Sequence, residues 1–182
     1  KRHPEFLKEC LNKANKKPLF TFLHFTKIHT ITVSEILKKY EWNDERFYNN
    51  KHDNLLNYDI SFKEAGNYAK IIHKTIKDLG IEENTIVIFF SDHGTGIGER
   101  FGERNYGSFT YEETIRSFYF FIGKNIIKNR VNNKLRESID ILPTILELIG
   151  IESNELPGES VAQVLVNENK KLDNKSHVFS ET

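Results

Sequence analysis

The residues best suited to chemistry in this sequence are Asp92 and His93, in the tetrapeptide Ser91-Asp92-His93-Gly94. They follow the apolar run Thr85–Phe90, which predicts a buried strand. An Asp and a His at the end of such a strand lie side by side, at the sheet edge where open α/β folds bind their ligands. Manganese, zinc and calcium-type sites accept carboxylate oxygen together with imidazole nitrogen. We therefore predict that Asp92 and His93 are metal ligands; the alternative is a solvated polar turn.

A second candidate group is His29, which follows the apolar run Leu19–Phe25. This run also predicts a buried strand, and a parallel arrangement would bring His29 to the same sheet edge as Asp92. There a histidine can donate a proton to a leaving oxygen or hold an anionic group of a substrate; the alternative is an exposed loop histidine. Lys27 would add positive charge for substrate binding, or else be a solvated lysine. His24, within the run, is expected to be buried among aromatic side chains.

Several glycines follow the Asp-His pair in the stretch Gly94–Gly102. Their spacing matches neither the dinucleotide motif G-x-G-x-x-G nor the phosphate-loop motif G-x-x-x-x-G-K-[ST], and no clear helix begins there. We expect a loop that folds around a metal site. The charged residues of this loop are expected to form stabilising ion pairs; they are Glu99, Arg100, Glu103 and Arg104.

Helical and strand patterns alternate along the chain, which predicts a layered α/β domain. Helices are predicted at Pro4–Asn15, Val33–Tyr40, Ser61–Leu79, Asp140–Ile149 and Ser160–Val166. Strands are predicted at Leu19–Phe25, Thr85–Phe90, Ser117–Ile122 and His177–Ser180. The polar stretch Glu41–Asn57 has no period and predicts a long loop, either shaping a substrate pocket or without a role.

Length, charge and cysteine content narrow the class of protein. The 182 residues suffice for one domain with a substantial core, so 1–182 is treated as a single α/β domain. The 26 basic and 26 acidic side chains balance, and no nucleic-acid partner is expected. No apolar run is long enough to span a membrane. Cys10 is the only cysteine, so no internal disulfide forms and the compartment is left open.

Six segments share their order and spacing with one known family. They are FLHFTKIHT, IVIFFSDHGTGIGE, YEETIRSFYFFIG, SIDILPTILELIGI, LPGES and HVFSE, and together they cover about Leu19–Glu181. They resemble the C-terminal part of the catalytic domain of the sulfatases, in the alkaline-phosphatase-like superfamily. The resemblance implies a layered α/β fold with a mixed, mostly parallel sheet flanked by helices. It also implies hydrolysis of a sulfate or phosphate ester at a bound divalent metal ion.

Carried over residue by residue, the resemblance makes Asp92 and His93 the second half of the metal site. Calcium is the expected ion, with manganese or zinc as alternatives. His29 matches the histidine that contacts the transferred group or the leaving oxygen. The family's nucleophile motif, C/S-x-P-x-R, is not found in this chain, and Cys10 lies in a helical pattern as a core residue. We expect an incomplete fragment whose nucleophile and first metal ligands lie upstream of Lys1.

Two protein ligands make a weak site for a hard cation that takes about six to eight oxygen ligands. We therefore expect this chain alone to bind metal weakly and to hydrolyse nothing. The segment Asn105–Phe109 lacks the Lys or His that many relatives have before the Tyr-Glu-Glu motif. The main interpretation is a sulfate-ester hydrolase, with a glycan among its candidate substrates. The alternatives are a phosphoryl-transfer enzyme (phosphodiesterase, phosphonate hydrolase or phosphate-group transferase) and an inactive sulfatase-like binding domain.

Overall fold

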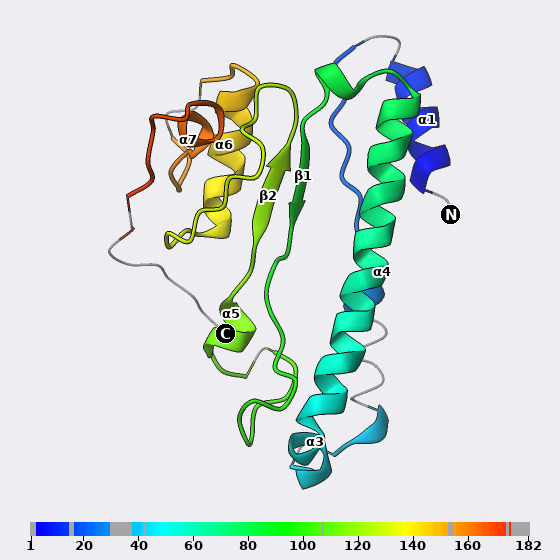
Figure 1. Cartoon of the computed structure of the whole chain (residues 1–182), viewed down its shortest axis with the longest axis vertical. Helices are drawn as coiled ribbons and strands as arrows, with labels where there is room; N and C mark the ends of the chain where they lie inside the picture. The colour runs from blue at the N-terminus through cyan, green and yellow to red at the C-terminus, as the bar shows by residue number, and fades with distance from the viewer. Residues whose placement is uncertain are drawn as a thin grey trace. The chain divides into compact units, whose positions relative to one another are not determined.

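A computed structural model of the chain describes residues 3–14, 17–29, 38–41, 43–106, 108–152, 155–173 and 175. The backbone forms two compact units, each built from two stretches of sequence, and Figure 1 labels their elements. Unit 1 comprises Lys1–Ile81 with Gly96–Tyr106, and unit 2 comprises Glu82–Thr95 with Gly107–Thr182. The glycine-rich stretch is therefore divided, and the Asp-His pair belongs to unit 2.

Unit 1 is built mainly from helices. α1 (His3–Ala14) and α4 (Lys51–Asp78) lie side by side, and the short α3 (Glu45–Asn49) precedes α4 (Figure 1). The helix predicted over 4–15 is confirmed by α1. The C-terminal end of α4 is also as predicted, because Gly80 follows it with a φ of +67°, in the left-handed region that glycine favours after a helix.

The prediction of a long loop over 41–57 is wrong, because α3 and the first turns of α4 occupy most of it. Asp44 caps α3 by accepting a hydrogen bond from the backbone N–H of Arg46. The buried Asn54 donates its side-chain amide to the carbonyls of Phe47 and Ile97, at 2.8 and 2.9 Å. A polar residue thus occupies a buried helical position, which hides the apolar period that sequence analysis relies on.

The predicted strand over 19–25 is also wrong, because these residues pair with no strand in the described part of the chain. They run beside α4 instead, and the ring of Phe25 stacks on that of Tyr68 at a centroid distance of 4.9 Å (Figure 1). Burial still alternates along the segment, which explains the strand-like pattern: Phe20 and Phe22 are exposed, while Thr21 and Leu23 are half-buried. His24 is exposed rather than buried.

Unit 2 contains the sheet. β1 (Val87–Phe90) pairs with β2 (Tyr119–Ile122) in antiparallel register, with Val87 opposite Ile122. Both strands lie within predicted strand segments. The expected mixed, mostly parallel sheet is not what the described residues form: they make a two-stranded antiparallel sheet. The backbone N–H of Ser91 donates to the carbonyl of Phe118 and extends the antiparallel ladder beyond Phe90. The chain leaves β1 and enters β2 at this same end of the sheet, as in any antiparallel pair.

The helices of unit 2 are α5 (Glu112–Ile115), α6 (Ile141–Leu148) and α7 (Ala162–Val166), with 3₁₀ turns at Glu82–Asn84 and Ser138–Asp140. α6 and α7 pack together and confirm the helices predicted over 140–149 and 160–166 (Figure 1). The predicted strand 177–180 and most of the predicted helix 33–40 lie outside the described residues. Within the described part of the chain, no helix has both the length and the apolar character needed to cross a membrane.

A buried carboxylate, Asp140, ties α6 to the segments that follow it. Its side chain is fully buried and accepts hydrogen bonds from Lys175 Nζ and the N–H of Glu159, both at 2.8 Å. The N–H of Glu137 donates to the same carboxylate at 3.2 Å. Burial by itself raises the pKa of Asp140, but the ammonium and the two N–H groups outweigh it and hold the pKa below its ordinary value.

Candidate active site

The Asp-His pair lies directly after β1, as predicted, in a turn that is held at both ends. Ser91 donates its backbone N–H to the carbonyl of Phe118 at 3.0 Å and its hydroxyl to the carbonyl of His93 at 2.5 Å. Gly94 donates its N–H to the carbonyl of Thr114, in α5, at 2.9 Å. The backbone of the turn is therefore fixed by β2 on one side and by α5 on the other.

Gly94 is a position where only glycine fits. A Cβ atom there would lie 2.3 Å from the carbonyl oxygen of Glu113, which is backbone and cannot swing away. Glu113 belongs to α5, and the buried Thr114 holds that helix with its hydroxyl 2.9 Å from the carbonyl oxygen of Tyr111. The Tyr-Glu-Glu-Thr segment thus forms the platform on which the Asp-His turn rests.

One side-chain atom of each residue of the pair forms a hydrogen bond within the turn. His93 Nδ1 lies 2.6 Å from the carbonyl oxygen of Gly94. A carbonyl oxygen only accepts, so Nδ1 carries the proton and the neutral ring keeps its lone pair on Nε2. Asp92 Oδ1 accepts the backbone N–H of His93 at 3.0 Å. The remaining atoms, Asp92 Oδ2 and His93 Nε2, are 3.7 Å apart, on side chains that are 80% and 38% exposed.

These two atoms fit a shared metal ion. For bonds of about 2.3 Å, a ligand separation of 3.7 Å corresponds to an angle of roughly 105–110° at the ion, which common coordination spheres accept. Among the residues that the structure describes, no three His, Cys, Asp or Glu side chains gather where they could hold a metal. A metal role for Asp92 and His93 therefore stays a prediction, and a hard cation bound by them would need further oxygen ligands.

His29 lies in unit 1, on a helical turn that begins at Lys27. His29 Nδ1 is 3.0 Å from the hydroxyl of Tyr106, and Lys27 Nζ forms an ion pair with Glu64 of α4 at 2.8 Å. The structure thus joins His29 to Tyr106 and Lys27 to Glu64, and it joins the two predicted metal ligands to each other. Convergence of His29 and Lys27 with the pair after β1 stays a prediction.

The glycine-rich loop uses its backbone donors internally. Gly96 and Asn105 exchange two backbone hydrogen bonds, of 2.5 and 3.0 Å, and the N–H of Ile97 donates to the carboxylate of Glu99 at 2.7 Å. Arg104 donates to the carbonyl of Tyr40. Because these N–H groups are already bound, the loop has the character of a closed structural loop and not of a phosphate cradle.

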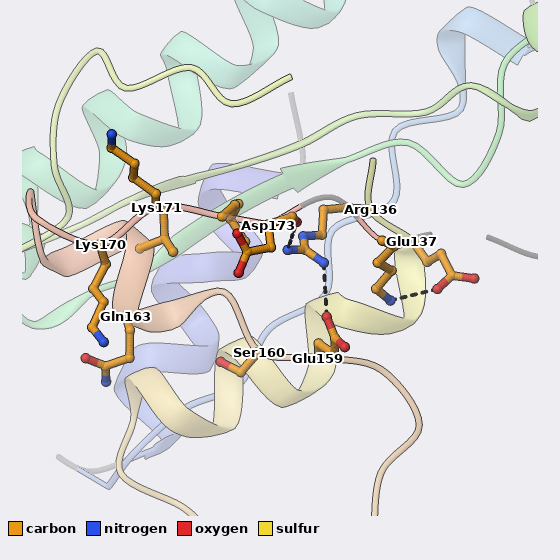
Figure 2. A pocket seen from close by; sticks show the side chains of 11 residues that line it. Arg136, Glu137, Glu159, Ser160, Gln163, Lys170, Lys171 and Asp173 are labelled. Carbon is orange, nitrogen blue, oxygen red and sulfur yellow. Dashed lines mark hydrogen bonds and ion pairs between the residues drawn. The ribbon is translucent and has the colours of Figure 1, made fainter. Parts of the chain in front are cut away.

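A cavity of about 660 Å³ lies in unit 2 beside α7, and Figure 2 shows the charged side chains around it. The charges are paired: Arg136 binds Glu159 at 3.0 Å and Lys175 binds Glu137 at 2.7 Å. Arg136 also donates to the carbonyl of Asp173. None of the predicted site residues lines this cavity. Its ion pairs hold the last described segment of the chain in place.

Sequence reasoning missed two contacts of the candidate site. The first is the hydrogen bond between Tyr106 and His29, which lie 77 positions apart. The only feature that drew attention to Tyr106 was that its segment, Asn105–Phe109, contains no Lys or His. The second is the close approach of Gly94 to α5. The glycine is visible in the motif, but the helix that requires it comes eighteen or more positions later.

Comparison with known proteins identifies the family. The family model described as Sulfatase matches residues 3–151, and the chain belongs to the sulfatase family. The chain is 29% identical over 181 residues to an endo-4-O-sulfatase of Bacteroides thetaiotaomicron, which covers 88% of this chain and 35% of the relative. It is also 29% identical over 149 residues to a delta 4,5-hexuronate-2-O-sulfatase of the same organism, covering 76% of this chain and 28% of the relative.

Solved structures agree with this assignment. The structure of a 2-O GAG sulfatase is similar with a TM-score of 0.63 and 22% identity, covering 89% of this chain and 38% of that chain. This likeness confirms the predicted alkaline-phosphatase-like α/β fold. The chain spans about a third of the length of these relatives. Membership of the family implies, in general, the use of a divalent metal ion.

Proposed function

We propose that the protein containing this chain hydrolyses sulfate esters of sulfated saccharides at a divalent metal ion. The observation that carries the proposal is the Asp-His pair after β1, with Asp92 Oδ2 and His93 Nε2 3.7 Å apart, in a chain of the sulfatase family. The saccharide is supported by the names of two relatives, an endo-4-O-sulfatase and a delta 4,5-hexuronate-2-O-sulfatase.

In this proposal Asp92 and His93 hold the metal, which when bound supplies positive charge for the ester oxygens. The hydrogen bond from His93 Nδ1 to the Gly94 carbonyl orients the ring and makes Nε2 the nitrogen that would bind the metal. Calcium is the ion we expect, because the carboxylate of Asp92 is a hard oxygen ligand. Manganese and zinc are the alternatives, because the imidazole of His93 is a softer nitrogen ligand. The remaining ligands, and the nucleophile, come from other residues of the protein.

His29 has a different part in the proposal. It lies on an exposed helical turn, where its ring can donate to the leaving oxygen or to an anionic oxygen of the ester. Lys27, two residues earlier, supplies positive charge for the ester group. The carboxylate of Glu64 neutralises that charge until a substrate anion competes for it, since the ion pair is solvent-exposed.

Phosphoryl transfer is the second candidate function. The observation that favours it is the segment 105–109, where Asn, Tyr, Gly, Ser and Phe provide no cation for the ester group. A sulfatase-like domain that binds without hydrolysing is the third candidate. The Asp-His pair after β1 argues against it, because an exposed carboxylate such as Asp92 contributes little to packing.

The test is a matched substrate panel with controlled metal. The intact protein is stripped with a chelator, and calcium, manganese or zinc is returned before assay on an aryl sulfate and the corresponding aryl phosphate, then on sulfated saccharides. We expect calcium to restore hydrolysis, with the sulfate cleaved faster. Faster cleavage of the phosphate would support phosphoryl transfer instead, and no turnover with any metal would support the binding domain. Residues 1–182 assayed alone should be inactive. Measurable turnover by them would contradict the proposal that the nucleophile comes from other residues of the protein.

A further inference from the structure

The hydrogen bond between Tyr106 and His29 joins two segments that are each held in place by other contacts. His29 ends a segment that lies against α4. The segment contacts α4 through the stack of Phe25 on Tyr68, at 4.9 Å, and through the exposed ion pair of Lys27 with Glu64, at 2.8 Å. His29 therefore has a defined position relative to α4.

The position of Tyr106 is defined by the residue before it, Asn105. Asn105 is 5% exposed, has a φ of +68°, and exchanges two backbone hydrogen bonds with Gly96. Asparagine tolerates this left-handed conformation better than most residues, so the chain direction into Tyr106 is well defined. The same loop is tied to α4, since Asn54 donates to the carbonyl of Ile97. α4 is thus the common frame for both partners.

We propose that Tyr106 is a positioning residue for His29, and this inference rests on the proposed function. In this role the Tyr106 hydroxyl, whose oxygen lies 3.0 Å from His29 Nδ1, acts as the donor of the hydrogen bond, which places the proton of the ring on Nε2. In that tautomer His29 presents an N–H donor to an oxygen of the sulfate ester. His93 is held in the opposite tautomer, because its Nδ1 faces a carbonyl. One histidine is prepared to donate to the ester and the other to bind the metal.

The kinetic test is Tyr106→Phe in the intact protein, with Tyr58→Phe as the matched control. Tyr58 lies on α4 against Phe62, at a centroid distance of 4.9 Å, and plays no part in the site. We expect Tyr106→Phe to lower kcat about ten-fold with KM nearly unchanged, as the loss of an orienting partner does, and Tyr58→Phe to match the wild type. In a His29→Ala background the Tyr106 substitution should have no further effect. Wild-type kcat in Tyr106→Phe, or additive losses in the double variant, would overturn the proposal.

A second readout separates this inference from the proposed function. Imidazole nitrogen NMR of the intact protein, labelled at histidine, reports the tautomer of His29 without any turnover. We expect protonated Nε2 in the wild type and a shift toward protonated Nδ1 in Tyr106→Phe. A wild-type spectrum with protonated Nδ1 would overturn the positioning role even if sulfate esters are hydrolysed. The expected spectrum without hydrolysis would reject the proposed function and retain the tautomer assignment.

Discussion

His93 and His29 are each oriented by a hydrogen bond at Nδ1, but from partners of different kinds. His93 is oriented by its immediate neighbour, because its Nδ1 donates to the carbonyl of Gly94. His29 is oriented by Tyr106, 77 positions away. In both, Nδ1 is hydrogen-bonded within the protein. The difference lies in the nature of the partner: a carbonyl only accepts and so places the proton on Nδ1, whereas a hydroxyl can also donate, as we propose for Tyr106.

The comparison also separates residues that are important for chemistry from those that are important for stability. Asp92 is an exposed carboxylate whose side chain is 80% accessible, while Asp140 is fully buried in a network with Lys175. The exposed carboxylate contributes little to folding and is free to bind a ligand. The buried one is committed to its hydrogen bonds, and its removal would leave the Lys175 ammonium with Glu137 but without one of its two carboxylate partners.

The largest expected effect comes from Asp92→Ala. Loss of a metal ligand should lower turnover of the intact protein at least about 100-fold, as removal of a major transition-state charge stabiliser does. The thermal midpoint should barely change, because the side chain is 80% exposed. Asp53→Ala is the control, since Asp53 is 74% exposed and lies on α4. Steady-state kinetics with thermal unfolding check both variants, and retention of most activity in Asp92→Ala would remove Asp92 from the metal site.

Gly94→Ala should disrupt the packing of the turn that carries His93 on α5, while the hydrogen bond of His29 to Tyr106 is kept. The new Cβ would lie 2.3 Å from the Glu113 carbonyl, and forcing the backbone apart should cost about 1–3 kcal/mol of unfolding free energy. Gly66→Ala is the matched control, because Gly66 lies within α4 with open space around it and should gain up to about 1 kcal/mol. Chemical denaturation of the two variants measures the difference. Equal stabilities would contradict the close packing of the turn on α5.

The carboxylate of Asp140 should make unit 2 sensitive to acid. Because its folded pKa lies below the ordinary value, its stabilisation is complete above the unfolded pKa and is lost as pH falls through the folded pKa. The unfolding free energy should therefore decrease steeply below about pH 4, near the ordinary pKa of an aspartate. In Asp140→Asn the unfolding free energy should decrease less at low pH than in the wild type, whereas substitution of the exposed Asp53 by Asn should leave this decrease unchanged. Denaturation at a series of pH values tests it, and parallel acid limbs in the wild type and Asp140→Asn would contradict the assignment.

Lys27→Met should have only a small effect on stability and on turnover. Its ion pair with Glu64 joins side chains that are 58% and 43% exposed, so less than about 1 kcal/mol is expected. If Lys27 also attracts the ester anion, KM should rise a few-fold while kcat is kept. Lys74→Met is the control, because Lys74 forms a similar exposed pair with Asp78 on α4 and has no place in the proposed site. An equal KM in both variants would remove Lys27 from substrate binding.

Elements with a clear period and clear ends were predictable from sequence. α6 has apolar residues on one side and is followed by Gly150, whose φ is +75°. β1 and β2 fall inside continuous apolar runs. The segment 19–25 was mistaken for a strand because contact with α4 on one side produces the same alternation as a sheet. Pattern alone does not distinguish a helix neighbour from a strand neighbour.

The sequence by itself determined the Asp-His pair, its place after a strand and its family, because all of these depend on neighbours along the chain. Only the tertiary structure decided which groups the ring nitrogens of the histidines contact, since that depends on partners such as Tyr106. It also decided why residue 94 is glycine, because the carbonyl that excludes a side chain comes from α5. Short-range order follows from local residue types, whereas these contacts exist only once distant segments have packed together.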